Sequence, residues 1–400
     1  MQEGPLGGHL SALADRLQAY GYARPSIRRK LQLLADFSRW LQRKGVEAHE
    51  LTPVHGRAFL LSRRRAGFRP HHGDRAAVAQ ALELLRQQGI TAEPIPQPIT
   101  TPIERLLEEY DFYLQKERSL AAATRTCYRP FVRQFLFKRF DDGRIDLAVL
   151  RASDVFTFVQ CAAVQLKGKR AQLMTAALRS FLRFARFRGD IELDLAACVP
   201  SVAGWSLSTV PKSLPPDQVE KVLAHCDRRS ATGKRDNAIL LLLARLGLRA
   251  GEVARLKLDD LDWERGCITV HGKMGRVDEL PLPADVGTAL VAYLKEGRPP
   301  GSNTRLLFLR SNAPLCGFAG QKAVGAVVKR ALEKAGIVSP RKGAHQFRHT
   351  LASELLRHGG SLTEIGQILR HRSPEATAIY AKVDLPSLRL LAVPWPGGNR

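Results

Sequence analysis

Two proline-rich stretches divide this sequence, and they constrain its fold more than any other feature. The first, residues 94–102, holds four prolines, and the second, residues 200–216, combines prolines with glycine and serine. Proline fixes its own φ and biases the preceding residue away from helix, so both stretches are predicted to be extended linkers. They separate three segments, 1–93, 103–199 and 217–400, each of a size that can form its own core.

The two segments before residue 200 show the apolar spacing of amphipathic helices. In the first, apolar residues recur at three- and four-residue steps over 31–41, and a new helix is indicated over 51–59. The second repeats this order loosely, with one helix over 128–140 and another from residue 153. We predict a helical bundle for each. The first segment is either a divergent copy of the second or an unrelated bundle.

The third segment adds a β-hairpin to its helices. Two short runs, 267–271 and 277–282, flank the connection Gly272–Arg276 and predict a pair of antiparallel strands. The fold class predicted for the whole chain is mainly α, with helical domains followed by a mixed α/β domain that holds a small antiparallel sheet. The helices expected in this segment are 217–226, 236–246, 285–296, 319–335, 345–357, 361–369 and 374–382.

Positive charge restricts the class of partner. The chain holds 62 Lys and Arg against 38 Asp and Glu, a formal net charge of +24, although 44% of its residues are hydrophobic. Such an excess repels itself unless a polyanion neutralises it, and the common polyanions are nucleic acids and anionic membrane surfaces. We therefore expect a folded protein with a polyanionic partner.

The sequence predicts no membrane span, no metal site and no disulfide framework. Its longest apolar run, Ala238–Ala244, is far shorter than the roughly 20 residues that cross a bilayer. The first residues lack the features of a secretory signal, so we expect a cytoplasmic protein. The six cysteines lie far apart without a C-x-x-C pair, which argues against zinc ligands and disulfides.

Two polar clusters in the third segment suit an anion. Arg249 stands where one apolar helix is expected to end and another to begin, and its planar fork there favours phosphate. Glu252 is within reach of it, so a structural Arg–Glu pair is the alternative. His345, Arg348 and His349 share one helical turn, where the arginine would repel a metal ion. Ordinary solvated residues at a helix start are the alternative explanation of that second cluster.

In their order and spacing these clusters resemble the motifs of the tyrosine recombinase (phage integrase-like) family. Gly247-Leu248-Arg249 followed by Glu252 resembles the first arginine motif of that family. The string from His345 to Thr350 resembles its His-x-x-Arg-His-Thr motif.

Two further matches complete the resemblance. Leu369-Arg370-His371 followed by Tyr380 is similar to the Leu-Gly-His motif and the nucleophilic tyrosine, with arginine in place of glycine. Lys273 stands in the hairpin turn where the family has a lysine. Gly251 and Phe347 are two smaller departures, and none of the departures removes a functional group.

The resemblance implies DNA strand exchange through a 3′-phosphotyrosyl intermediate formed on Tyr380. A free phenol titrates near pH 10, so it needs a base and a positive neighbourhood, and His345 is the candidate base. Lys273 would protonate the leaving 5′ oxygen. Arg249 and Arg348 would hold the non-bridging oxygens, to which paired guanidiniums are well matched. The catalytic residues expected are Arg249, Lys273, His345, Arg348, His371 as a further hydrogen-bond donor, and Tyr380, with Glu252 in support and no metal or cofactor.

The resemblance also bears on partners. Residues 103–199 are similar to the family's core-binding, SAM-like domain, and 217–400 to its catalytic domain. It implies double-stranded DNA as partner, a homo-tetramer on that DNA within the nucleoid, and accessory recombinases or DNA-bending proteins. An apolar tail, Pro386–Trp395, could be buried by a neighbouring protomer or by its own domain. Integration, excision and transposition stay open as biological roles.

Three other functions fit parts of the sequence. A type IB topoisomerase-like enzyme would use the same tyrosine and arginine chemistry as a monomer. A non-catalytic DNA-binding protein with this fold would be expected to have lost at least one catalytic residue, and all six are present. A basic RNA-associated protein would explain the charge but not the ordered motifs.

Overall fold

The structure is a computed structural model that describes residues 3–71, 73–91, 101–141, 144–166, 168–202, 210–272, 275–302, 304–339, 343–383 and 388–389. Its packing divides the chain into two units. One combines Met1–Ala92 with Thr209–Arg400, and the other is Glu93–Ser208. Each of the three segments expected from the sequence has a hydrophobic core of its own, and the division into three domains stays a prediction.

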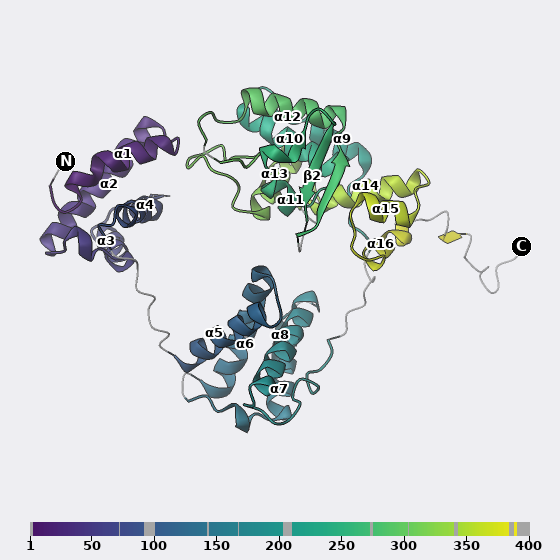
Figure 1. The fold of residues 1–400 in the computed structure, drawn as a ribbon, viewed down its shortest axis with the longest axis horizontal. Coiled ribbons are helices and arrows are strands. Elements are labelled where there is room, and N and C mark those ends of the chain that lie inside the picture. Colours follow the sequence, from purple (N-terminus) through teal and green to yellow (C-terminus); the bar gives the residue numbers. More distant parts are fainter. Residues whose placement is uncertain are drawn as a thin grey trace, which may run out of the picture. The chain divides into compact units, whose positions relative to one another are not determined.

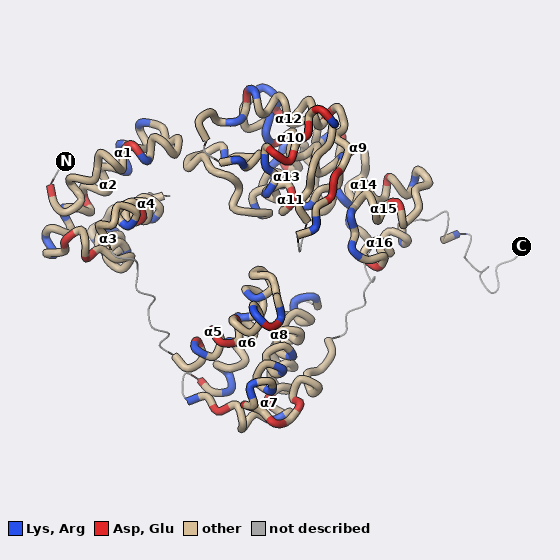
Figure 2. The backbone as a smooth tube through the Cα atoms, viewed as in Figure 1, with Lys and Arg blue, Asp and Glu red and all other residues tan. Residues whose placement is uncertain are grey.

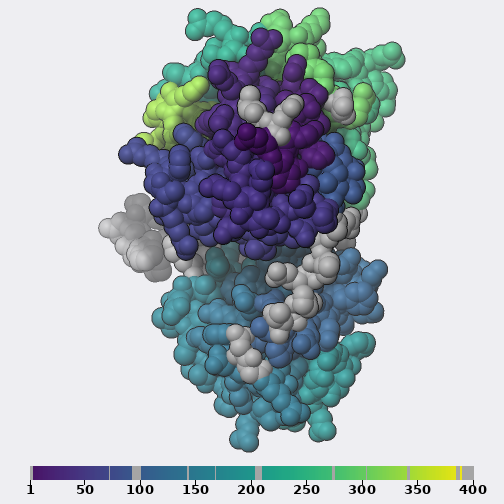
Figure 3. Space-filling view, turned by 90° about the vertical axis from the view of Figure 1, so that its left-hand side faces the viewer, coloured from purple at the N-terminus to yellow at the C-terminus, as the bar shows by residue number. Residues whose placement is uncertain are grey.

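Helices α1 to α4 form the N-terminal bundle. Their bounds are α1 Leu10–Ala19, α2 Arg24–Arg43, α3 Pro53–Arg65 and α4 Asp74–Gln87, with a 3-10 turn at Ala48–Glu50 before α3. Phe37 and Phe59 meet at the centre of the core, with ring centroids 4.8 Å apart. Figure 3 shows this segment, in purple, as a closely packed body.

Helices α5 to α8 form the second unit. Their bounds are α5 Pro102–Lys116, α6 Ala122–Phe140, α7 Ala152–Gln165 and α8 Gly168–Phe187, with a 3-10 turn at Leu147–Val149 before α7. Tyr110 and Phe181 pack edge to face in its core. Figure 1 labels the helices of both bundles. In each bundle a long second helix precedes a 3-10 turn, and that turn directly precedes the third helix.

The segment from residue 210 has α10 as its buried centre and a three-stranded sheet beside it. The sheet has the order β1-β2-β3 with antiparallel pairs, and Val270 on β2 faces Asp278 on β3. The elements are α9 Pro216–Ala224, α10 Ala231–Arg245, α11 Ala250–Arg255, β1 Leu261–Asp262, β2 Cys267–His271, β3 Val277–Pro281, α12 Ala284–Glu296, α13 Gln321–Lys334, α14 His345–Arg357, α15 Leu362–Ile368 and α16 Glu375–Ala378. The predicted fold class, mainly helical with a small antiparallel sheet, is confirmed.

Two predicted helix boundaries were wrong. Helix α10 begins at Ala231, before the expected residue 236, because the Ser230 hydroxyl accepts a hydrogen bond from the Gly233 N–H and caps the helix there. The helix expected over 374–382 is regular only in α16 and continues as a 3-10 turn, Ile379–Val383. Tight i→i+3 turns are common at helix ends, and this one carries Tyr380.

Two further expectations concern the C-terminal tail and membrane-spanning helices. The tail Pro386–Trp395 lies outside the described residues except for Leu388 and Arg389. No helix among the described residues is both long and apolar enough to cross a membrane.

Hydrogen bonds made by Thr350 connect the start of the third segment to α14. Its hydroxyl accepts a hydrogen bond from the Leu214 N–H (3.0 Å) and donates to the Leu214 carbonyl (2.8 Å), and both residues are buried. Thr350→Val keeps the shape but leaves both main-chain groups unpaired. We expect it to lower the free energy of unfolding by about 1–3 kcal/mol in urea titrations. Thr288→Val, which removes an exposed hydroxyl on α12, is the matched control and should change stability little.

Candidate active site

Arg348 is the buried centre of the candidate site. It lies on the first turn of α14, with 2% of its surface exposed. Its guanidinium donates to the Gly247 carbonyl (2.6 Å) and to the Leu369 carbonyl. Gly247 has a φ of +57°, and a Cβ there would lie 2.9 Å from the Leu369 side chain and 3.0 Å from that of Leu351, so glycine suits both the conformation and the packing of this turn. Burial, followed by the charges of two neighbouring arginines, lowers the pKa of Arg348 to about 10.

Arg249 and Glu252 form the second part, at the start of α11. The Glu252 carboxylate accepts from the Arg249 main-chain N–H (2.8 Å) and from its Nη1 (2.7 Å). Glu252 is buried, whereas 35% of the Arg249 side chain is exposed, which leaves part of that guanidinium open to a ligand. Burial alone would raise the pKa of Glu252, but hydrogen bonds from Arg249 and the charge of Arg370 hold it below its ordinary value.

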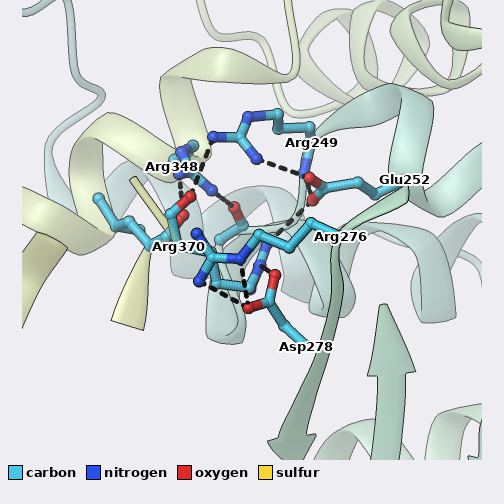
Figure 4. A network of polar contacts seen from close by, with 8 residues as sticks. Arg249, Glu252, Arg276, Asp278, Arg348 and Arg370 are labelled. Atoms are coloured by element: carbon cyan, nitrogen blue, oxygen red, sulfur yellow. Dashed lines mark hydrogen bonds and ion pairs between the residues drawn. The ribbon is translucent and has the colours of Figure 1, made fainter. Parts of the chain in front are cut away.

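Arg370 binds to the Arg249–Glu252 pair and is, after Arg348 and Arg249, the third guanidinium of the site (Figure 4). Its Nη2 donates to the Glu252 carboxylate (2.9 Å), and its own carbonyl accepts from Arg249 Nη2 (3.5 Å). Its Nε lies 3.9 Å from the Asp278 carboxylate on β3, which also pairs with Arg276. One polar network therefore connects α11, the hairpin and the segment before His371.

Tyr380 contacts this cluster through α14. Its hydroxyl lies 2.9 Å from His349 Nδ1, and the side chain is almost wholly buried. Burial raises the pKa of Tyr380 to about 12, although the charges of Arg348 and Arg249 act in the opposite direction. At neutral pH the phenol is therefore protonated and needs a base before it can act as a nucleophile.

The two other histidines of the motifs are neutral at pH 7. Burial, then the charges of Arg348 and Arg249, lower the pKa of His371 to about 4 and also lower that of His345. His371 lies face to face with the Tyr380 ring, with centroids 6.3 Å apart, and its Nδ1 is 2.7 Å from the Thr377 hydroxyl. His345 stacks on His349 at 5.7 Å.

The structure thus gathers five of the six predicted catalytic residues within one network of contacts and electrostatic neighbours. Lys273 lies outside the described residues. Two residues of the site, His349 beside the tyrosine hydroxyl and Arg370 beside Glu252, were not among the predicted catalytic residues. The four-residue spacing of His345 and His349 on one helix was a signal for the first. No spacing rule indicates the second, because its partner Glu252 is far away in the sequence.

These side chains provide guanidinium cations that can bind an anion. They also provide a phenol and neutral imidazoles. Among the described residues, no group of three or more His, Cys, Asp or Glu side chains is placed to hold a metal ion. The arrangement suits attack by a tyrosine on a phosphodiester held by arginines.

Comparison with known proteins decides the family. The phage integrase family model matches residues 212–385, and the phage integrase N-terminal SAM-like domain matches residues 107–189. The integrase/recombinase y4rA of Sinorhizobium fredii is 48% identical over 99% of this chain and 96% of its own length. The chain belongs to the phage integrase family of tyrosine recombinases. Tyrosine recombinase XerD of Mycobacterium tuberculosis is 32% identical over 73% of this chain and 96% of its own.

A solved structure supports the fold. The crystal structure of the XerH site-specific recombinase, bound to a palindromic difH substrate in a post-cleavage complex, matches with a TM-score of 0.58. It is 20% identical and covers 71% of this chain and 83% of that one. The enzyme is thus a tyrosine site-specific recombinase, and the topoisomerase-like and non-catalytic alternatives are not supported.

Glu252→Gln tests the buried ion pair. The amide keeps the shape of the side chain but leaves Arg370, also buried, with the more distant Asp278 carboxylate, 3.9 Å away, as its remaining countercharge among the described residues. Breaking one partner of a buried pair typically costs about 3–5 kcal/mol, and we expect a loss of this size in urea unfolding. Asp259→Asn removes a carboxylate from an exposed ion pair with Arg305 and should leave stability essentially unchanged. A small effect of Glu252→Gln would mean that solvent reaches the pair.

The lowered pKa of His371 makes stability depend on pH. The native value of about 4 lies below the ordinary 6.5, so between these values the unfolded chain binds more protons. The contribution of neutral His371 to the free energy of unfolding is therefore complete above about pH 6.5 and is lost as the pH falls toward 4. We expect His371→Asn to lose less stability than the wild type between about pH 7 and pH 5 in urea titrations. His225→Asn, at an exposed histidine, should follow the wild type; equal slopes for all three proteins would refute the prediction.

Proposed function

We propose that this recombinase cleaves double-stranded DNA with Tyr380 and rejoins it through a 3′-phosphotyrosyl intermediate. The observation that carries the proposal is the meeting of the Tyr380 hydroxyl, His349 and the guanidinium cluster around Arg348. The Tyr380 oxygen forms a bond to phosphorus while the bond from phosphorus to the 5′ oxygen breaks. The tyrosine proton passes to the histidines of α14, where His345, the predicted base, lies against His349.

Arg249 and Arg348 stabilise the charge that grows on the non-bridging oxygens. Arg348 is held by two main-chain carbonyls and Arg249 by Glu252, so both guanidiniums are already oriented before the phosphate binds. His371 adds a hydrogen bond to the phosphate. Lys273 supplies the proton that the leaving 5′ oxygen takes up.

Because Tyr380 is buried, the site is in a resting state to which no DNA is bound. The Tyr380 side chain is 1% exposed, so its hydroxyl meets a phosphate only after the 3-10 turn Ile379–Val383 has shifted. DNA binding brings about this shift, because it supplies the anion toward which the arginines are directed.

The same proposal covers the partners. Lys and Arg occur along the helices of both units, as a double-stranded DNA partner requires (Figure 2). The bundle α1–α4 acts as a second DNA-binding bundle, a divergent copy of α5–α8, and the shared order of helices and 3-10 turns supports this. From family resemblance the active form is a homo-tetramer on DNA, with accessory recombinases or DNA-bending proteins as further partners in the cytoplasm.

Tyr380→Phe tests the nucleophile. The variant should bind DNA as the wild type does and form no covalent adduct on a nicked suicide duplex, in which cleavage releases a short fragment and traps the intermediate. Denaturing gels of protein mixed with end-labelled duplex measure the adduct.

Tyr293→Phe is the matched control for this experiment. Tyr293 is a buried tyrosine of α12 whose hydroxyl accepts a hydrogen bond from the Leu309 N–H (3.1 Å). This variant should keep adduct formation. An adduct formed by Tyr380→Phe would show that another residue is the nucleophile.

A further inference from the structure

Arg370 is a buried arginine at a position where the family motif has glycine. Its side chain is 3% exposed, and its φ of +55° lies in the left-handed region that glycine adopts most readily. The backbone therefore keeps the conformation suited to glycine, while the side chain adds contacts that glycine cannot make.

Arg370 contacts Arg249 through two routes. One is direct, because the Arg370 carbonyl accepts from Arg249 Nη2 (3.5 Å). The other passes through Glu252, which binds Arg249 with Oε1 and Arg370 with Oε2 (Figure 4). The rotamer of Glu252 is thus held from both sides, and Glu252 in turn fixes the guanidinium of Arg249.

The charges give this arrangement a chemical consequence. Without Arg370, the single negative charge of Glu252 would neutralise Arg249, the more exposed of the two phosphate-binding arginines. With Arg370 present, one carboxylate serves two guanidiniums, so positive charge remains for a phosphate. Asp278 contributes little to offset this, because its shorter contacts are with Arg276 and it lies 3.9 Å from Arg370.

The hydrogen bonding of Arg370 is incomplete. Its Nη1 is buried and has no hydrogen-bond partner among the described residues. A buried arginine that served stability alone would be expected to have its donors satisfied. An unsatisfied buried donor beside the two phosphate-binding arginines is typical of a site arranged for function rather than for stability.

We propose that Arg370 is a positioning residue of the catalytic site: it holds Glu252, keeps Arg249 oriented and leaves the charge of Arg249 for the scissile phosphate. This inference rests on the proposed function and deepens it. Arg370 acts through Arg249 and does not itself touch the DNA.

The test compares Arg370→Gly with the wild type on two suicide duplexes. One carries an ordinary scissile phosphate, and the other a methylphosphonate, in which a methyl group replaces a non-bridging oxygen and removes its charge. On the phosphate, the single-turnover rate of adduct formation at saturating protein should fall about 10- to 100-fold, with DNA affinity unchanged. On the methylphosphonate the loss should shrink to a few-fold, because there is little charge for Arg249 to stabilise.

Two further variants keep the test decisive. Arg370→Lys keeps the charge without the planar fork, so its rate should lie between those of the wild type and Arg370→Gly, and it replaces the glycine variant if that does not fold. Arg235→Lys weakens another buried arginine, bound to Asp236 and the Leu309 carbonyl, and controls for lost stability. The rate of this variant relative to the wild type should be the same on both duplexes.

The outcomes separate the two proposals. A loss on the phosphate that shrinks on the methylphosphonate supports the positioning role. A loss of equal size on both duplexes, or no loss on the phosphate, overturns it. If the wild type itself forms no adduct on the phosphate duplex, the proposed function fails, and the positioning role fails with it.

Discussion

The Glu252 carboxylate is buried between two guanidiniums, and the rest of the site depends on this contact. Taking a charge out of water costs several kcal/mol, so a buried carboxylate persists only when hydrogen bonds and countercharges satisfy it. Here Arg249 and Arg370 satisfy both oxygens. Because Arg370 directly precedes His371, the contact links the first arginine motif to the segment that leads to Tyr380.

Burial also sets the protonation states that the chemistry requires. It keeps Tyr380 protonated and His345 and His371 neutral at pH 7, so a nucleophile and proton acceptors coexist beside fixed cations. Burial, followed by the charges of Arg249 and Arg370, lowers the pKa of Arg348 to about 10, so repulsion among the arginines adds to the effect of burial. A phosphate relieves this repulsion, so binding and catalysis draw on the same charges.

The sequence predicted the elements well where their signals are local. Helix α14 begins and ends at the expected residues, and the hairpin strands agree within a residue, because apolar spacing and turn residues specify them directly. The contacts of Arg370 with Glu252 and Arg249 were not predictable, since they join residues more than a hundred positions apart. The hydrogen bond between His349 and Tyr380 depends on how a 3-10 turn packs on α14, and the apolar pattern predicted a regular helix there.

Identification of the residue that carries the nucleotide would show directly whether Tyr380 is the nucleophile. Wild-type protein trapped on a suicide duplex can be digested with nuclease and protease, and the modified peptide sequenced by tandem mass spectrometry. We expect a nucleotide attached through its 3′ phosphate to Tyr380, within the peptide that follows Arg372. A nucleotide on any other tyrosine, or on a serine or cysteine, would contradict this expectation.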